Sequence, residues 1–205
     1  MDIHTPHAEG TPLAPTFYDG PTQARDDVRI QIRFFTYNTP EGLVTGAAST
    51  VSFVIPRPAK AVWPILKDWN LWMNSYGYFW SGVIGDLEGQ LFRVSIRNNP
   101  NETPQLHPNI YKVERAIPEH LLVISQPVPQ DGSNGGISPG FHAYILNGSP
   151  QETLVTAVME HSSRTHDKTP QETLQFWRDL SREQEWLEKW RDIFIPTLKE
   201  LACKS

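Results

Sequence analysis

The chain has 205 residues, enough for one domain with a sizeable core, and this length alone does not require two domains. The formal net charge is −5 and no basic arm or face is visible, so nucleic acid is not an expected partner. The single cysteine, Cys203, excludes an internal disulfide framework and a cysteine-built metal site.

The N-terminal sequence MDIHTPHAEG has neither the basic start nor the apolar segment of a secretory signal. No apolar stretch reaches the roughly 18 residues that a membrane-spanning helix needs. We therefore expect a soluble, cytoplasmic protein with no integral membrane segment.

The chain begins with residues rich in proline and glycine. Residues 1–25 show little apolar periodicity and are expected to form a flexible arm, followed by one domain over residues 26–205. Apolar residues then alternate with polar ones from Val28 to Phe34, and residues 43–55 have the pattern of a second long strand. Alternation with period two is typical of a strand that buries one face.

A short helix is expected after the second strand. Pro58 suits its first turn, whereas Pro64 removes an interior hydrogen bond, so this helix should be bent or broken into two. The apolar residues that share one helical face are Ala61, Val62, Ile65, Leu66 and Trp69.

The middle of the chain alternates between apolar runs and short turns. Links this short favour antiparallel pairing. Loops rich in Pro and Asn or in Gly are expected at residues 98–109 and 127–140. Strands are expected at residues 76–84, 90–97, 110–116, 121–126, 141–146 and 153–162.

The chain ends in a long amphipathic helix. The sequence from Thr169 to Glu172 matches a capping box with proline at the first helical position. Apolar residues recur at helical spacing from Phe176 to Leu201, and Pro196 is expected to kink the helix.

The order of these elements, together with three motifs, resembles the START-type helix-grip superfamily, which includes birch-pollen-allergen-like and polyketide cyclase/dehydrase-like proteins. The resemblance covers about residues 48–201. Its motifs are the proline–Val62–Trp63–Asp68–Trp72 spacing, the segment YKVERAIPEHLLV at residues 111–123, and the segments FHAYIL and TLVTAVMEHSS within residues 141–163.

The resemblance implies an α+β fold. A curved antiparallel sheet of about seven strands would wrap around the long C-terminal helix, with two short helices at one end and a ligand cavity between sheet and helix. The strand at residues 28–37 is extra to this pattern. It would extend the sheet edge or fold over the cavity, and it could pair within the chain or with a second copy.

Strand parity supplies candidate catalytic residues. His161 shares a mainly apolar face with Met159, and an imidazole among apolar walls could act as a general acid or base. Tyr144 and Arg115 are candidates for orienting a substrate, with Arg115 expected on the same face as Tyr111. The alternatives are a structural histidine and an arginine that reaches solvent at the rim.

Aromatic and neighbouring side chains are the candidate ligand-binding residues, and for each of them packing in the core is the alternative. They are Trp63, Trp72, Tyr76, Tyr78, Trp80, Phe92, Tyr111, His142, Met159, Trp177, Trp190 and Phe194. No metal or cofactor is expected, because no metal-binding histidine pair, phosphate-binding loop or dinucleotide fingerprint is present. The glycine-rich segment at residues 132–136 is a candidate gate over the cavity.

Three functions stay open. The leading hypothesis is binding of a hydrophobic or aromatic small molecule, because no clear catalytic constellation is visible. The alternative is a cyclase, aromatase or dehydratase-type enzyme that acts on a polyketide-like substrate with His161 as acid or base. A protein-interaction module is the third hypothesis, which a closed or filled cavity would favour.

Overall fold

The computed structural model describes residues 14–25, 27–39, 42–73, 79–97, 102–103, 105–125, 137–165, 168–183 and 185–204. Nine strands form one antiparallel sheet in the order β1-β2-β3-β9-β8-β7-β6-β5-β4. The strands are β1 (Thr16–Arg25), β2 (Val28–Thr39), β3 (Gly42–Ile55), β4 (Phe79–Ser81), β5 (Leu91–Arg97), β6 (Gln105–Ile117), β7 (Leu121–Ser125), β8 (Ile137–Gly148) and β9 (Thr153–Thr165).

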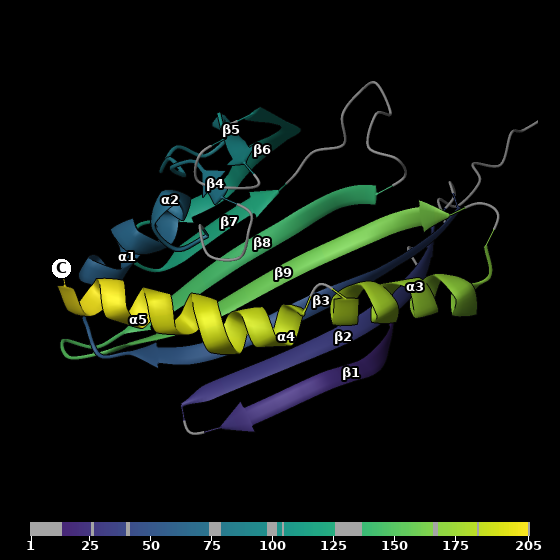
Figure 1. The fold of residues 1–205 in the computed structure, drawn as a ribbon, viewed down its shortest axis with the longest axis horizontal. Coiled ribbons are helices and arrows are strands. Elements are labelled where there is room, and N and C mark those ends of the chain that lie inside the picture. Colours follow the sequence, from purple (N-terminus) through teal and green to yellow (C-terminus); the bar gives the residue numbers. More distant parts are fainter. Residues whose placement is uncertain are drawn as a thin grey trace, which may run out of the picture.

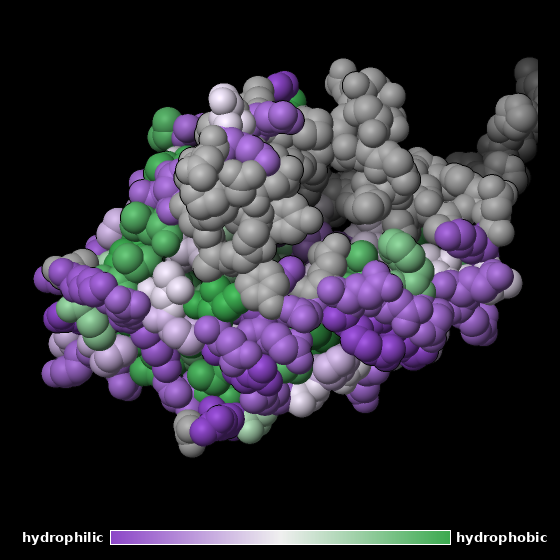
Figure 2. Space-filling view, in the orientation of Figure 1, coloured by the Kyte–Doolittle hydropathy of each residue, from purple (hydrophilic) through white to green (hydrophobic). Residues whose placement is uncertain are grey.

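The helices cover one face of this sheet, as the helix-grip fold requires (Figure 1). None of them, within the described ranges, is both long and apolar enough to cross a membrane. On the face shown in Figure 2, the coloured hydrophobic side chains form separate groups among hydrophilic ones. The helices are α1 (Ala59–Lys67), α2 (Trp69–Trp72), α3 (Pro170–Glu183), α4 (Trp186–Lys189), the π-helix η1 (Trp190–Phe194) and α5 (Ile195–Lys204).

The core lies between the sheet and these helices. Alternate residues of β3, from Thr45 to Ile55, are buried on the helix side, as the alternating pattern predicts. The larger apolar cluster lies beneath α1, α2 and α5 and includes Trp69 and Trp72. A smaller cluster beneath α3 contains Ile32, Phe34, Ala47, Leu174 and Trp177.

The expectation of a flexible arm up to residue 25 is wrong for residues 16–25. These residues form β1, which pairs with β2 from Thr16 to Arg25 with a register shift between Asp19 and Thr22. Pro21 lies within that irregularity, on an edge strand, where a missing backbone donor costs little. The predicted extra strand is therefore flanked within the chain on both sides, by β1 and β3.

The first helical region is short and divided into two helices, as expected, but the division does not lie at Pro64. Pro64 lies inside α1, which continues to Lys67. Asp68 then begins α2 by accepting a 3.0 Å hydrogen bond from the Asn70 N–H. The backbone bond that Pro64 cannot make is therefore lost without ending the helix at that residue.

The C-terminal helix is interrupted earlier than the expected kink at Pro196. Glu185 has a left-handed backbone conformation, with φ of 50°, between α3 and α4. The π-turn η1 then precedes Pro196, and the N–H of Ile195 donates to the Trp190 carbonyl. Because Pro196 lacks an N–H and would crowd the Asp192 carbonyl in a regular α-helix, the wider turn before it relieves the conflict.

The predicted capping box at the start of α3 is confirmed. The N–H of Thr169 donates to Glu172 Oε2 at 2.8 Å, and the N–H of Glu172 donates to Thr169 Oγ1 at 3.3 Å. Each side chain thus satisfies a backbone donor that the first helical turn leaves free.

Replacing the capping residue tests how much α3 depends on it. We expect Thr169→Ala to lower the melting temperature by about 2–4 °C, because one helix cap is lost. Gln171→Ala, an exposed change in the same turn that keeps the cap, is the control and should leave the melting temperature nearly unchanged. Equal melting temperatures for both variants would show that the capping box does not stabilise the protein.

Candidate functional site

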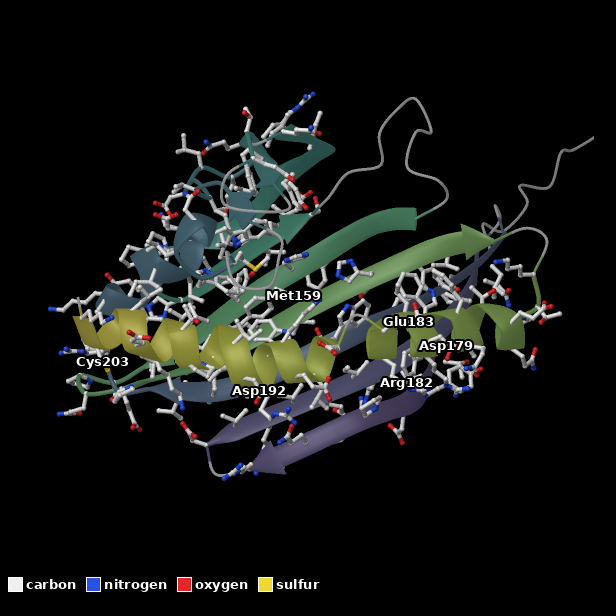
Figure 3. The ribbon with its side chains drawn as sticks, in the orientation of Figure 1. Met159, Asp179, Arg182, Glu183, Asp192 and Cys203 are labelled. Carbon is white, nitrogen blue, oxygen red and sulfur yellow. The ribbon has the colours of Figure 1, made fainter. Side chains whose placement is uncertain are left out.

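A small cavity lies between the central strands β3 and β9 and the helical segment formed by α4 and η1. Its volume, as bounded by described residues, is about 140 Å³. Figure 3 shows Met159 on the helix side of β9, whereas Asp192 projects from the other side of the C-terminal helix. The described residues that line the cavity are Ser49, Met159, His161, Trp186, Lys189, Trp190 and Phe194.

Two histidines meet at this cavity. His161 lines it, and the His142 ring lies edge-on behind His161, with ring centroids 5.9 Å apart. The far side of His142 packs against Trp69 at 5.7 Å, and His161 packs against Trp186 at 5.5 Å. Each imidazole is therefore in contact with an indole ring from a helix, His142 with Trp69 of α2 and His161 with Trp186 of α4.

Burial keeps both imidazoles neutral. It lowers the pKa of His142 to about 3, and the neighbouring His161 contributes to the shift because two adjacent positive charges repel. Burial also lowers the pKa of His161. The Nδ1 atom of His142 is buried without a hydrogen-bond partner among the described residues. At neutral pH each ring thus has one donor and one acceptor nitrogen.

Lys189 is the cation in the lining. Partial burial lowers the pKa of its ammonium group, and the charge of Glu185 opposes this effect. No carboxylate occurs among the described residues that line the cavity. The polar lining groups that are described, on Ser49, His161 and Lys189, can all donate hydrogen bonds.

Aromatic side chains fill the space next to the cavity. Trp69 packs edge-on against Tyr111 and Phe92, with centroids 5.6 and 6.3 Å away. Trp72 packs edge-on against Tyr144 at 6.2 Å and Phe194 at 5.6 Å. Among the described residues, these aromatic side chains occupy the space between the sheet and α2 and η1 next to the cavity.

Two tyrosines of this aromatic packing are strongly buried. Burial raises the pKa of both Tyr111 and Tyr144, so both hydroxyls stay protonated. Trp69 opposes the shift of Tyr144 as a nearby donor, although the Tyr144 hydroxyl has no hydrogen bond of ordinary geometry within the described structure. Tyr144 therefore belongs to the packed wall behind the cavity.

The structure brings together many of the residues that the sequence analysis selected. Met159, His161, Trp190 and Phe194 line the cavity, and His142 lies directly behind it. The aromatic packing next to it contains Trp72, Phe92, Tyr111 and Tyr144. Tyr76, Tyr78 and the proposed gate at residues 132–136 lie outside the described residues, and Trp80 is described only as part of β4.

Arg115 lies apart from this group, so the prediction from strand parity is wrong. A register shift in the β6–β7 pairing occurs between Val113 and Arg115, which moves Arg115 off the face of Tyr111. Its side chain is exposed, and Nη1 lies 3.1 Å from Glu88 Oε1. A β-bulge of this kind reverses the face of every later residue, and sequence alternation does not reveal it.

Two of the selected tryptophans also lie elsewhere. Trp63 is buried on α1, with Lys67 Nζ 5.7 Å from its ring. Trp177 packs in the smaller core cluster, and its Nε1 donates to Thr45 Oγ1 at 3.3 Å. Both tryptophans pack in the core, which was the alternative to ligand binding.

Three lining residues were not selected from the sequence. Ser49 is on the same strand face as Val51, and Trp186 lies one helical turn before Trp190. Strand alternation and helical spacing could therefore have identified both residues as inward-facing. Lys189 gave no such signal, because its position depends on the breaks at Glu185 and η1.

A larger groove of about 510 Å³ lies between β1, β2 and the helices α3 and α4. Its lining includes both signs of charge, such as Arg182 and Asp19, whose side chains are 78% and 91% exposed. It lacks the buried imidazoles of the smaller cavity, so the smaller cavity is the better candidate site.

The buried histidines should make folding stability depend on pH. In the unfolded chain a histidine binds a proton near pH 6.5, but folded His142 resists protonation down to about pH 3. Stability is therefore retained above pH 6.5 and lost as pH falls towards 3, by about 1.4 kcal/mol per pH unit for each such group.

The test is denaturant unfolding of His142→Phe between pH 7 and pH 4. We expect the free energy of unfolding to decrease less steeply with falling pH than in the wild type, because one depressed pKa is removed. His120→Gln changes an exposed histidine and should leave the dependence of the unfolding free energy on pH as in the wild type. An unchanged slope in His142→Phe would show that His142 already takes up its proton in the folded state.

No protein-family model and no curated protein matches the chain. Its structure resembles protein NE0264 of Nitrosomonas europaea, with a TM-score of 0.54, 14% identity, and coverage of 77% of this chain and 94% of that chain. A protein from Arthrobacter aurescens has a TM-score of 0.54, 12% identity, and coverage of 77% and 87%. SA2116 of Staphylococcus aureus has a TM-score of 0.53, 7% identity, and coverage of 78% and 94%. At these identities the likeness shows the fold alone.

Proposed function

We propose that this helix-grip protein binds a hydrophobic or aromatic small molecule in the cavity between its sheet and its C-terminal helix. The observation that carries the proposal is a cavity whose walls combine two indoles, a phenyl ring and a thioether with a neutral imidazole. Ligand sites are typically apolar cavities in which a few polar groups set the orientation.

The volume limits the ligand. A cavity of about 150 Å³ with apolar walls is known to hold one benzene molecule. The cavity here measures about 140 Å³ between described residues, so it suits a single six-membered ring. A polycyclic ligand would have to displace Trp190 or Phe194, which pack against each other at 5.3 Å.

Filling the cavity tests this proposal. Ser49 is buried in the wall, and Ser49→Leu would place a larger side chain in the space for the ligand. We expect toluene and phenol to bind the wild type and to bind Ser49→Leu at least about tenfold more weakly. Calorimetry gives the affinities, and the fluorescence of Trp186 and Trp190 reports occupancy.

The matched control is Thr50→Leu, one residue along the same strand with its side chain exposed on the opposite face. It should bind toluene as the wild type does. Melting temperatures of both variants separate ligand exclusion from unfolding. Wild-type affinity in a folded Ser49→Leu variant would place the ligand elsewhere.

Catalysis in the same cavity is the second candidate, because His161 faces the cavity beside Lys189. A neutral imidazole can accept a proton from a bound substrate, and a positioned acid or base is sufficient for some cyclisations and dehydrations. Tyr144 would support the wall, while Arg115 lies outside this cavity.

His161→Ala separates the two candidates. The variant and the wild type are incubated with a library of single-ring aromatic compounds, and mass spectrometry follows binding and mass change. If the protein is an enzyme, we expect turnover to be lost while uncharged rings such as toluene still bind, because the apolar walls remain and the proton acceptor is removed. Binding without mass change in the wild type supports the carrier function, and unaltered turnover in the variant removes His161 from the mechanism.

A further inference from the structure

We propose that the ligand of this cavity is a single-ring aromatic carboxylate, with its ring among Met159, Trp190 and Phe194 and its carboxylate on Lys189 and His161. This inference rests on the proposed binding function and specifies the chemical class of the ligand. It follows from the charge and the size of the cavity.

The charge of the lining favours an anion. Lys189 supplies a positive charge, Ser49 and His161 supply neutral donors, and none of the described lining residues is acidic. The larger groove on the other side of α4 differs in this respect, because Glu185 and Glu188 line it together with arginines. Complementarity of charge therefore points to a negatively charged group in the smaller cavity.

The partial burial of Lys189 strengthens the case. Removing an ammonium group from water is unfavourable, and the lowered pKa of Lys189 reflects that cost. Glu185 compensates in part, since its charge opposes the shift. A carboxylate bound beside Lys189 would oppose the shift in the same direction as Glu185 does.

His161 adds a directional contact. Its neutral ring retains one N–H donor and packs against Trp186 with an angle of 45° between the two ring planes. A carboxylate accepts hydrogen bonds at both oxygens, so one oxygen can face Lys189 and the other His161. A phenol or an aromatic alcohol offers one oxygen and no full charge, and it would use only part of this arrangement.

The size of the cavity favours a single ring over larger anions with apolar groups. A volume of about 140 Å³ between described residues is close to that of a cavity that holds one benzene molecule. Benzoate is the simplest compound of the proposed class. Three probes of similar size differ from it in the polar group: toluene has none, benzyl alcohol has an uncharged hydroxyl, and benzylamine has a positive charge.

Calorimetry with the full chain, in a buffer free of carboxylates, compares these four probes. We expect benzoate to bind at least about tenfold more tightly than toluene or benzyl alcohol, and benzylamine to bind most weakly. In Lys189→Met, benzoate should lose this advantage while toluene binds as before. Lys189→Arg keeps the positive charge and should retain part of the preference for benzoate.

Lys60→Met is the matched control, because Lys60 is an exposed lysine on α1 outside the cavity lining. Lys60→Met should not alter the order of the affinities for the four probes. Toluene binding without a preference for benzoate, or an unchanged preference in folded Lys189→Met, would overturn the carboxylate inference and leave the binding function intact. If no probe binds the wild type, both the inference and the proposed function are overturned.

Discussion

The packing of Trp69 and Trp72 beneath the sheet sets the shape of the space between sheet and helix. Both indoles are fully buried, and both come from α2, whose start is held by Asp68. Trp72 Nε1 donates to the Leu66 carbonyl at 3.2 Å, so the indole cannot turn without leaving a buried donor unsatisfied. Because Trp72 also packs against Trp190 and Phe194, it positions the helical wall of the cavity.

That wall is held at both ends. On one side, Trp177 joins α3 to β3 through its bond to Thr45. On the other side, Arg57 donates to the carbonyls of Ala202 and Cys203, at 3.1 and 2.9 Å, and ties α5 to the segment after β3. The irregular stretch between these anchors carries every helical residue described in the cavity lining. The geometry of the candidate site therefore depends on contacts far from it.

The predictable features depend on local patterns. Alternation in β2 and β3 and the capping box at Thr169 each follow from a few neighbouring residues. The aromatic character of the cavity could also be predicted, because strand parity and helical spacing place Met159, His161 and Trp190 on inward faces.

The errors arise where tertiary structure overrides such patterns. Residues 16–25 form a strand because β2 offers a free edge, despite their proline and glycines. Arg115 turns outward at a bulge that only the pairing with β7 reveals. Lys189 enters the cavity because two helix breaks set its direction, and no periodicity marks such a residue.

The π-turn at Trp190–Phe194 also has a consequence for the length of this segment. A π-turn accommodates one residue more than an α-helical turn, so deleting one residue there would restore regular α-helix. Each residue advances a regular α-helix by about 100°, so one additional residue in an unbroken helix would rotate everything before it by that amount relative to α5. The wider turn takes up the additional residue, and Trp186 and Lys189 therefore keep their direction towards the cavity while α5 keeps its place. The π-turn thus preserves which side chains face the sheet despite one residue of additional chain length.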